Sequence, residues 1–192
     1  MSSEVKVNKI SPSSGTSIVI GDSGDTVSLG SGVSASGFGK ILQVLQTVKT
    51  DVFSTGAGAN SPAEITGLTA SITPASSSNK VLVMFSISLG SSSTNNGACF
   101  LYRDSTAIQI GDARGSRPRS SKNWETSNTW NQSEVTIVCL DSPSTTSSVT
   151  YSVKIGGNGS VTNYVNRSGR DTDGSTEDCT NASQVILMEI EG

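Results

Sequence analysis

Apolar and polar residues alternate in short runs along most of the chain after residue 39. The clearest run covers 80–89, where Val81, Val83, Phe85, Ile87 and Leu89 share one side, because successive side chains of a strand point to opposite faces. Clusters of Ser, Gly, Asn and Pro between the runs accept turn geometry. The pattern predicts about nine strands, over 40–52, 63–72, 80–89, 98–103, 107–110, 134–140, 148–155, 160–165 and 183–190.

Short strands at this regular spacing are typical of all-β sandwiches and barrels. Residues 40–52 also fit a helical period, but their Thr and Val content favours a strand. Asp104 and Ser105 separate two runs and predict a hairpin. Leu82 and Met84, opposite the apolar side of 80–89, predict that one end of that strand is covered on both sides. We expect a jelly-roll-like β-sandwich, in which the apolar side of 80–89 packs against Val135, Ile137, Val149, Tyr151 and Val153.

The first 39 residues follow a different pattern. A short sequence that ends on Gly occurs twice there, and alternate positions of both copies are apolar: Ile18, Ile20, Val27 and Leu29. A single chain this thin has no core in which to bury these side chains, whereas three copies around an axis would have one. We therefore expect an extended N-terminal β arm for trimerisation over 1–39, and a β-sandwich domain over 40–192.

The composition narrows the classes of function. There are 37 Ser and 20 Thr among 192 residues, only 15% of residues are charged, and the formal net charge is −3. Such a composition excludes a helical bundle, and the acidic balance argues against binding to nucleic acid. The chain has no His, which excludes a Ser-His-Asp triad and zinc sites that use His.

No apolar run is long enough for a transmembrane helix or a secretory signal. We therefore expect no membrane insertion, and synthesis in a reducing cytosol. Cys99 and Cys139 lie in apolar alternating runs, which favours buried reduced thiols; Cys179 lies in a polar segment.

One stretch, 111–132, lacks alternation and is long for a loop in a compact domain. It carries four basic residues and both tryptophans of the chain: Arg114, Arg117, Arg119, Lys122, Trp124 and Trp130. Trp and Arg dominate many binding interfaces, and Trp rings stack on sugars, so Arg114, Arg117, Arg119, Trp124 and Trp130 are candidates for receptor binding. The alternative is that the Trp rings close the open end of the sandwich or pack between subunits.

The acidic residues of the chain give weaker indications of a functional site. The stretch 171–175 resembles a calcium loop, but its Gly stands at the wrong position for one, so we expect an acidic loop without metal. Asp104 and Asp112 could form a carboxylate pair for glycoside hydrolysis, yet both lie in turn sequences where Asp bonds the backbone. We expect no catalytic residue, no metal and no cofactor.

Two long segments resemble known proteins. The sequences at 40–51 (KILQVLQTVKTD) and 68–83 (LTASITPASSSNKVLV), extended by 101–113 and 140–146, are similar to tail-fibre-type virion proteins of bacteriophages, especially marine and cyanobacterial ones. Residues 18–39 resemble the shaft segments of such proteins. The resemblance implies a trimeric virion fibre or fibre tip located on the phage tail.

We therefore expect a homotrimeric, non-enzymatic tail fibre or fibre tip. Its arm would attach to other virion structural proteins of the tail or baseplate, and its sandwich would contact a glycan or protein of the host surface. A capsid decoration or head-fibre protein with the same architecture is the first alternative. A polysaccharide-degrading enzyme is the second.

Overall fold

The structure is a computed structural model that describes residues 10–11, 14–15, 31 and 40–192. Gly39–Gly192 forms one compact unit, separate from Met1–Phe38. The predicted axial side chains of the arm, Ile18, Ile20, Val27 and Leu29, lie outside the described residues, and their role stays a prediction.

The described residues form eleven strands and no helix. The strands are β1 (Ile41–Lys49), β2 (Phe53–Thr55), β3 (Ala63–Ile72), β4 (Lys80–Ser91), β5 (Asn95–Arg103), β6 (Thr106–Ile108), β7 (Lys122–Thr126), β8 (Ser133–Asp141), β9 (Val149–Gly156), β10 (Asn163–Val165) and β11 (Ser183–Ile190). Within this part of the chain, no helix is long and apolar enough to cross a membrane.

The first sheet is antiparallel and has β4 in its interior. Leu89 of β4 pairs with Ser133 of β8 and with Val165 of β10, so β8 and β10 lie on opposite edges of β4. β11 also pairs with β4, on the edge that β10 uses, and β1 and β2 pair with β11 and β10 respectively. The six strands therefore lie in four rows across the sheet. β1 and β2 share the first row, β11 and β10 share the second, β4 forms the third and β8 forms the fourth.

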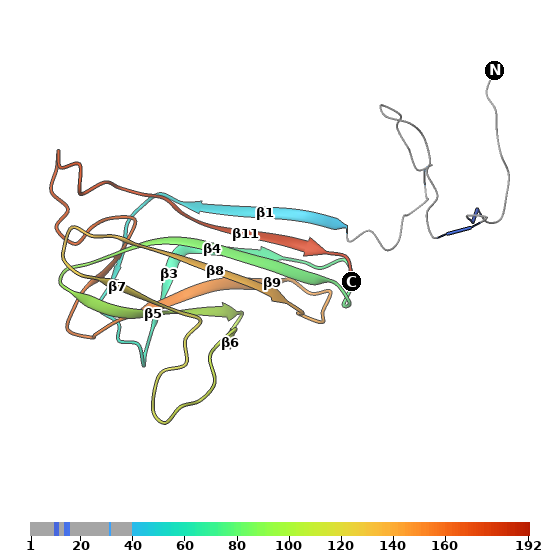
Figure 1. The fold of residues 1–192 in the computed structure, drawn as a ribbon, viewed down its shortest axis with the longest axis horizontal. Helices are drawn as coiled ribbons and strands as arrows, with labels where there is room; N and C mark the ends of the chain where they lie inside the picture. Colours follow the sequence, from blue (N-terminus) through green and yellow to red (C-terminus); the bar gives the residue numbers. More distant parts are fainter. Residues whose placement is uncertain (1–9, 12–13, 16–30, 32–39) are drawn as a thin grey trace, which may run out of the picture. The chain divides into compact units, whose positions relative to one another are not determined.

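The second sheet is also antiparallel and has β9 and β5 in its interior. Cys99 of β5 pairs with Ile155 of β9 and with Lys122 of β7, and Leu101 pairs with Val153 of β9 and with Ile108 of β6. β6 and β7 therefore share one edge of β5, and the rows are β3, β9, β5, and β7 with β6. The two sheets pack on each other as a β-sandwich-like fold (Figure 1).

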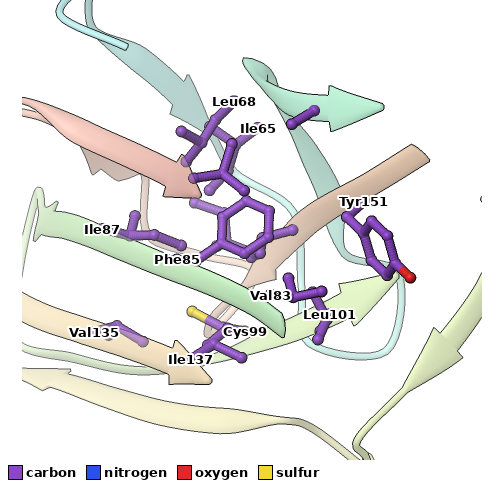
Figure 2. Packing of buried hydrophobic residues seen from close by; sticks show 14 of the residues in the cluster. Ile65, Leu68, Val83, Phe85, Ile87, Cys99, Leu101, Val135, Ile137 and Tyr151 are labelled. Atoms are coloured by element: carbon purple, nitrogen blue, oxygen red, sulfur yellow. The ribbon is translucent and has the colours of Figure 1, made fainter. Parts of the chain in front are cut away.

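The core lies between the sheets, as the alternation predicts. Val81, Val83, Phe85 and Ile87 of β4 are at most 1% exposed, because the period of the strand places them all on the inner face. Their expected partners are buried in the same cluster: Val135, Ile137, Val149, Tyr151 and Val153. Figure 2 shows Phe85 in the middle of this cluster, with Leu68 and Ile65 of β3 on one side.

An ion pair joins the two sheets at one end of the core. Arg103 of β5 places Nη1 at 2.8 and 2.9 Å from the carboxylate oxygens of Asp141 on β8. The hydroxyl of Tyr151 donates to the same carboxylate at 2.7 Å. Burial, and then this bond to Asp141, raises the pKa of Tyr151. The ring therefore stays neutral and anchors β9 to β8.

Most strand boundaries agree with the pattern to within two residues, but β5 begins at Asn95 rather than at 98 and β10 begins at Asn163 rather than at 160. Two further differences are larger. The predicted strand 40–52 ends at Lys49, and a separate β2 follows at Phe53–Thr55. The stretch 111–132 is not one loop, because β7 forms within it and pairs with β5. Only Trp124 and Thr126 of β7 point inward and are buried, and two inward positions are too few to register as alternation. The predicted hairpin at Asp104 and Ser105 is confirmed by the pairing of β5 with β6.

Candidate functional site

The outer face of β5 is the floor of a groove. Asn96, Ala98, Phe100 and Tyr102 alternate with the inward residues Cys99 and Leu101, so they point away from the core. The solvent-facing side of a sandwich strand is normally polar. On β5, however, this side carries the aromatic rings of Phe100 and Tyr102. Phe100 is only 6% exposed, whereas Tyr102 is half-buried, so the ring of Tyr102 is the more accessible apolar surface of this floor.

The segment between β6 and β7 lies over this floor. It projects from the lower edge of the sandwich in Figure 1. Its own backbone holds its two central arginines: Arg117 Nη1 donates to the carbonyl of Arg114 at 3.1 Å, and Arg119 Nε donates to the carbonyl of Gly111 at 2.6 Å. At its end Ser121 N–H donates to the carbonyl of Cys99 on β5 at 2.9 Å. The bond from Ser121 attaches the end of the segment to β5, and the two arginine bonds lie within the segment.

Two adjoining cavities occupy the groove. One has a volume of about 310 Å³ and is lined by Ala59, Asn96, Gly97, Ala98, Arg117, Pro118, Ser120 and Asn123. The other has a volume of about 240 Å³ and is lined by Ala59, Asn60, Pro62, Phe100, Tyr102, Ala107, Pro118 and Arg119. Ala59 and Pro118 belong to both linings, so the two cavities form one groove along β5, which we call the β5 groove.

Positive charge is concentrated at this groove, although the chain as a whole is acidic. Arg117 and Arg119 each line one of its two cavities. Lys154 of β9 lies with Nζ 4.2 Å from the centre of the Tyr102 ring, which is the geometry of a cation–π contact. A ligand with a carboxylate or sulfate group would therefore find guanidinium partners beside an aromatic ring.

The structure separates the five residues predicted to bind a receptor. Arg117 and Arg119 line the β5 groove, whereas Arg114 is exposed and lines neither cavity. Trp124 is 5% exposed and belongs to the core cluster, where it covers Gly97. This packing favours the alternative that the ring has a structural role, and a receptor-binding role for Trp124 stays a prediction.

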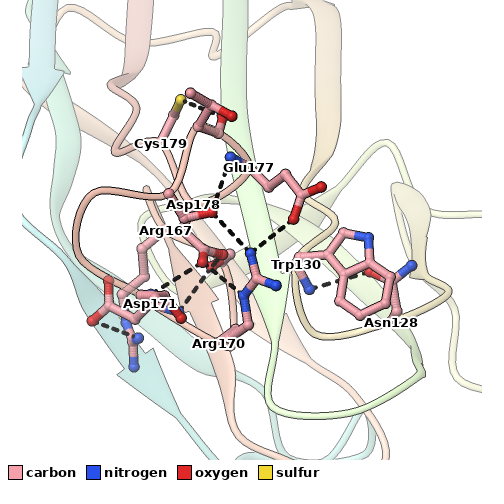
Figure 3. Close-up of polar contacts among 12 residues, drawn as sticks. Asn128, Trp130, Arg167, Arg170, Asp171, Glu177, Asp178 and Cys179 are labelled. Atoms are coloured by element: carbon pink, nitrogen blue, oxygen red, sulfur yellow. Dashed lines mark hydrogen bonds and ion pairs between the residues drawn. The ribbon is translucent and has the colours of Figure 1, made fainter.

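Trp130, the other tryptophan, lies in a different place and is 45% exposed. The guanidinium of Arg170 lies 5.6 Å from its ring centre and is held by Asp178 and Glu177, at 2.8 and 2.9 Å (Figure 3). The backbone joins the same two segments, because Arg170 N–H donates to the carbonyl of Thr129 at 2.8 Å. Trp130 thus contacts the acidic segment 166–182 rather than the β5 groove.

Asp178 and Asp104 use their carboxylate oxygens within the protein. The hydroxyl of Ser168, and then the guanidinium of Arg170, lower the pKa of Asp178 to about 2, although burial opposes the shift. Asp104 lies in the turn between β5 and β6 with a φ of 52°, and its carboxylate accepts a hydrogen bond from the backbone N–H of Thr150 on β9 at 2.9 Å. Among the described residues, no group of three or more Cys, Asp or Glu is placed to hold a metal ion.

The cysteines of the described part are free. Cys99 is fully buried in the core, as predicted, and burial raises its pKa to about 12. Cys139 is half-buried, and Cys179 is exposed. Burial, followed by the charge of Asp141, also raises the pKa of Cys139. Neither Cys99 nor Cys139 therefore has the character of a reactive thiolate.

The sequence analysis missed the floor of the groove. Phe100 and Tyr102 alternate with Cys99 and Leu101, which point into the core, and this alternation was the available signal. A linear pattern does not show that residues 59–62, 96–102 and 117–123 lie together on one surface. Comparison with known proteins finds neither a family model nor a curated protein that matches this chain.

Proposed function

We propose that this protein is a trimeric, non-enzymatic virion structural protein of the tail-fibre type, whose sandwich domain binds an anionic glycan of the host surface. The observation that carries glycan binding is the β5 groove, whose lining includes Arg117, Arg119 and Tyr102. The resemblance of 40–51 and 68–83 to phage tail-fibre proteins supports the virion role.

The groove offers the three kinds of contact that a sugar needs. An aromatic ring such as that of Tyr102 packs on the C–H face of a pyranose. Amide groups, here those of Asn96 and Asn123, donate to and accept from hydroxyl groups. A guanidinium group binds a carboxylate or sulfate through paired N–H donors. The groove is open along β5, which suits a polymer chain better than a small enclosed metabolite.

The order of the strand rows supports a jelly roll. For this comparison the strand rows are numbered in chain order, and each of the pairs β1 and β2, β6 and β7, and β10 and β11 counts as one row. The rows of the first sheet then lie in the order 1-8-3-6, and those of the second sheet in the order 2-7-4-5. Two interleaved Greek keys produce this order, and jelly rolls of this kind are found in viral capsid proteins and in lectins. Both uses suit a virion protein that binds glycans.

Binding measurements with three variants test the groove. Arg117→Ala combined with Arg119→Ala, and separately Tyr102→Ala, should weaken binding to host cells and to their acidic surface polysaccharide by about tenfold or more. Arg114→Ala is the matched control, because it removes an exposed arginine of the same segment that does not line the groove. Equal binding by all four proteins, or an equal loss with Arg114→Ala, would contradict glycan binding in this groove.

Two further measurements test the rest of the proposal. Antibody labelling of purified virions, viewed by electron microscopy, should place the protein on the tail. Labelling on the head would replace the tail fibre by the capsid-decoration or head-fibre alternative, and the absence of label would contradict a virion role. Release of reducing sugar from the bound polysaccharide would favour the enzymatic alternative.

A further inference from the structure

The outer face of the first sheet is apolar over four neighbouring rows of strands. The pairing registers place Leu140 of β8, Leu82 of β4, Met188 of β11 and Val44 of β1 in one line across the sheet. The next line toward the other end holds Val138, Met84 and Ile186, and ends at Gln46. All seven apolar side chains point away from the core, because their neighbours along each strand are the inward residues.

These side chains are open to solvent in the single chain. Val44 is 55% exposed, Val138 48% and Leu140 54%. Ile41, which pairs with Ile190 next to the first line, is 53% exposed. We call the surface made by these two lines together with Ile41 and Ile190 the apolar sheet face. Soluble single chains rarely expose a continuous apolar surface of this extent, and such a surface marks a contact site.

We propose that the apolar sheet face is where copies of this chain pack against one another, with β1, β11, β4 and β8 of each copy turned toward the common axis. The size of the face suits this occupant. The whole outer face of these four strand rows, which includes the apolar sheet face, covers roughly 590 Å² before side-chain relief is counted, at about 4.8 Å a row and about nine residues of about 3.4 Å each. That is of the order of the ~800 Å² per partner that a standard stable interface buries.

The charge pattern of the face favours a second copy over other partners. Of the outward positions on the strands of this sheet, only Lys80 and Glu134 are charged, one at each end. The face therefore lacks the basic cluster that nucleic acid or an anionic lipid surface requires. A line of polar residues, Thr136, Ser86 and Gln184, adjoins the apolar lines. If two copies are related by an axis that runs along the strands, the same lines of residues face each other. The apolar lines of one copy then contact the apolar lines of the other, and the polar line contacts the polar line.

The connection to the arm gives a second reason. Residues 1–39, in which we expect four side chains to face a three-fold axis, lead directly into Ile41 and Val44 on this face. The sequence also predicts a cover here, because Leu82 and Met84 make both sides of that end of β4 apolar. In the described residues these two side chains are only half-buried. The inference rests on the proposed function only for the number of copies, which is three.

Photo-crosslinking in the full-length chain tests the contact directly. A photoreactive amino acid at position 140 should crosslink one copy of the chain to another, whereas the same group at position 71, an exposed position on the opposite sheet, should not. A crosslink from position 140 to residues 1–39 of the same chain would overturn the proposal in favour of the arm as occupant. A trimer by native mass spectrometry without a crosslink at position 140 would also overturn it, while leaving the trimeric fibre of the proposed function intact.

Substitution measures the strength of the same contact. Leu140→Lys, and separately Val44→Lys, should raise the dissociation constant of the assembly at least about tenfold. Ser71→Lys is the matched control, because it adds the same side chain to the outer face of the other sheet. Sedimentation velocity at micromolar concentration gives the result, and circular dichroism checks the fold. A wild-type protein that is monomeric under these conditions, or Lys variants that assemble as the wild type does, would overturn the proposal.

Discussion

The two outer faces of the sandwich are built by the same alternation and differ in their chemistry. On the first sheet the outward positions of β1, β4, β8 and β11 carry mostly Val, Leu, Ile and Met at one end. On the second sheet the outward positions of β3 and β9 carry Ser, Thr and charged residues, such as Ser71, which bonds Thr150 at 2.7 Å, and Ser152, which bonds Glu64 at 3.0 Å. Only β5 adds aromatic rings to that face, and the arginines of the β5 groove line the cavities along this strand.

This difference indicates that the faces have different partners. An apolar face gains free energy when it leaves water, at about 25 cal/mol per Å², so its natural occupant is another apolar face. A polar face with guanidinium groups gains little from burial, but it offers directional contacts to a charged, hydroxylated ligand. Under the proposals above, one face serves assembly and the other serves binding, so changes on one face should leave the other function intact.

A change in the shared core is the reference for this comparison and has the largest expected effect. Phe85 is 1% exposed and lies between the two sheets (Figure 2). Phe85→Ala should lower the free energy of unfolding by about 3–5 kcal/mol, because it removes buried surface and leaves a cavity. Urea unfolding measures this loss, which should weaken assembly and binding together. A loss below about 1 kcal/mol would show that Phe85 does not pack as described.

A change under the binding face should have a somewhat smaller effect. Trp124→Ala removes a ring that is 5% exposed in the core, but its buried Nε1 has no hydrogen-bond partner in the described residues, and relief of that cost offsets part of the loss. We expect a loss of about 3 kcal/mol in thermal or urea unfolding. Trp130→Ala, at a ring that is 45% exposed, is the control and should cost less than about 1 kcal/mol. Equal losses for the two variants would contradict the different positions of the rings.

The smallest expected effect is a loss of stability in acid that depends on Glu189 of β11, a strand of the sheet that carries the apolar face. Burial by itself would raise the pKa of Glu189, but hydrogen bonds from Asn79 Nδ2, Gln43 Nε2 and the N–H of Ala75 outweigh burial and lower it below the ordinary 4.5. A lowered pKa in the folded state contributes stability above the unfolded value, and this contribution is lost as the pH falls through the folded value.

Unfolding free energies measured from pH 5 downward should therefore decline below about pH 4.5 in the wild type. Glu189→Gln should be less stable at pH 7, because an amide cannot accept all three bonds as a carboxylate does, and its decline toward acid should be shallower. Glu191→Gln, an exposed glutamate next to the same strand end, should follow the wild type. An unchanged acid slope in Glu189→Gln would show that another group causes the decline.

Much of the fold could be predicted from the pattern of residues. Val81, Val83, Phe85 and Ile87 alternate with less apolar residues, and a strand has only two faces, so the inward face of β4 follows from the sequence alone. The hairpin at Asp104 follows from local turn chemistry in the same way. The short strands β2 and β7 could not be predicted, because their pairing with β10 and β5 stabilises them, and no period can develop over three to five residues.

The candidate site, like the fold, could be predicted from the sequence only in part. The sequence by itself determined that Arg117 and Arg119 lie in an irregular segment and that the chain is built of alternating strands, because these properties depend on neighbours in the chain. Only the tertiary structure decided that Trp124 is covered while Trp130 is open, and that Leu82, Val44 and Leu140 share one face. The physical reason is that burial depends on which strands lie side by side and on what packs over them, and those contacts join residues that are far apart in the sequence.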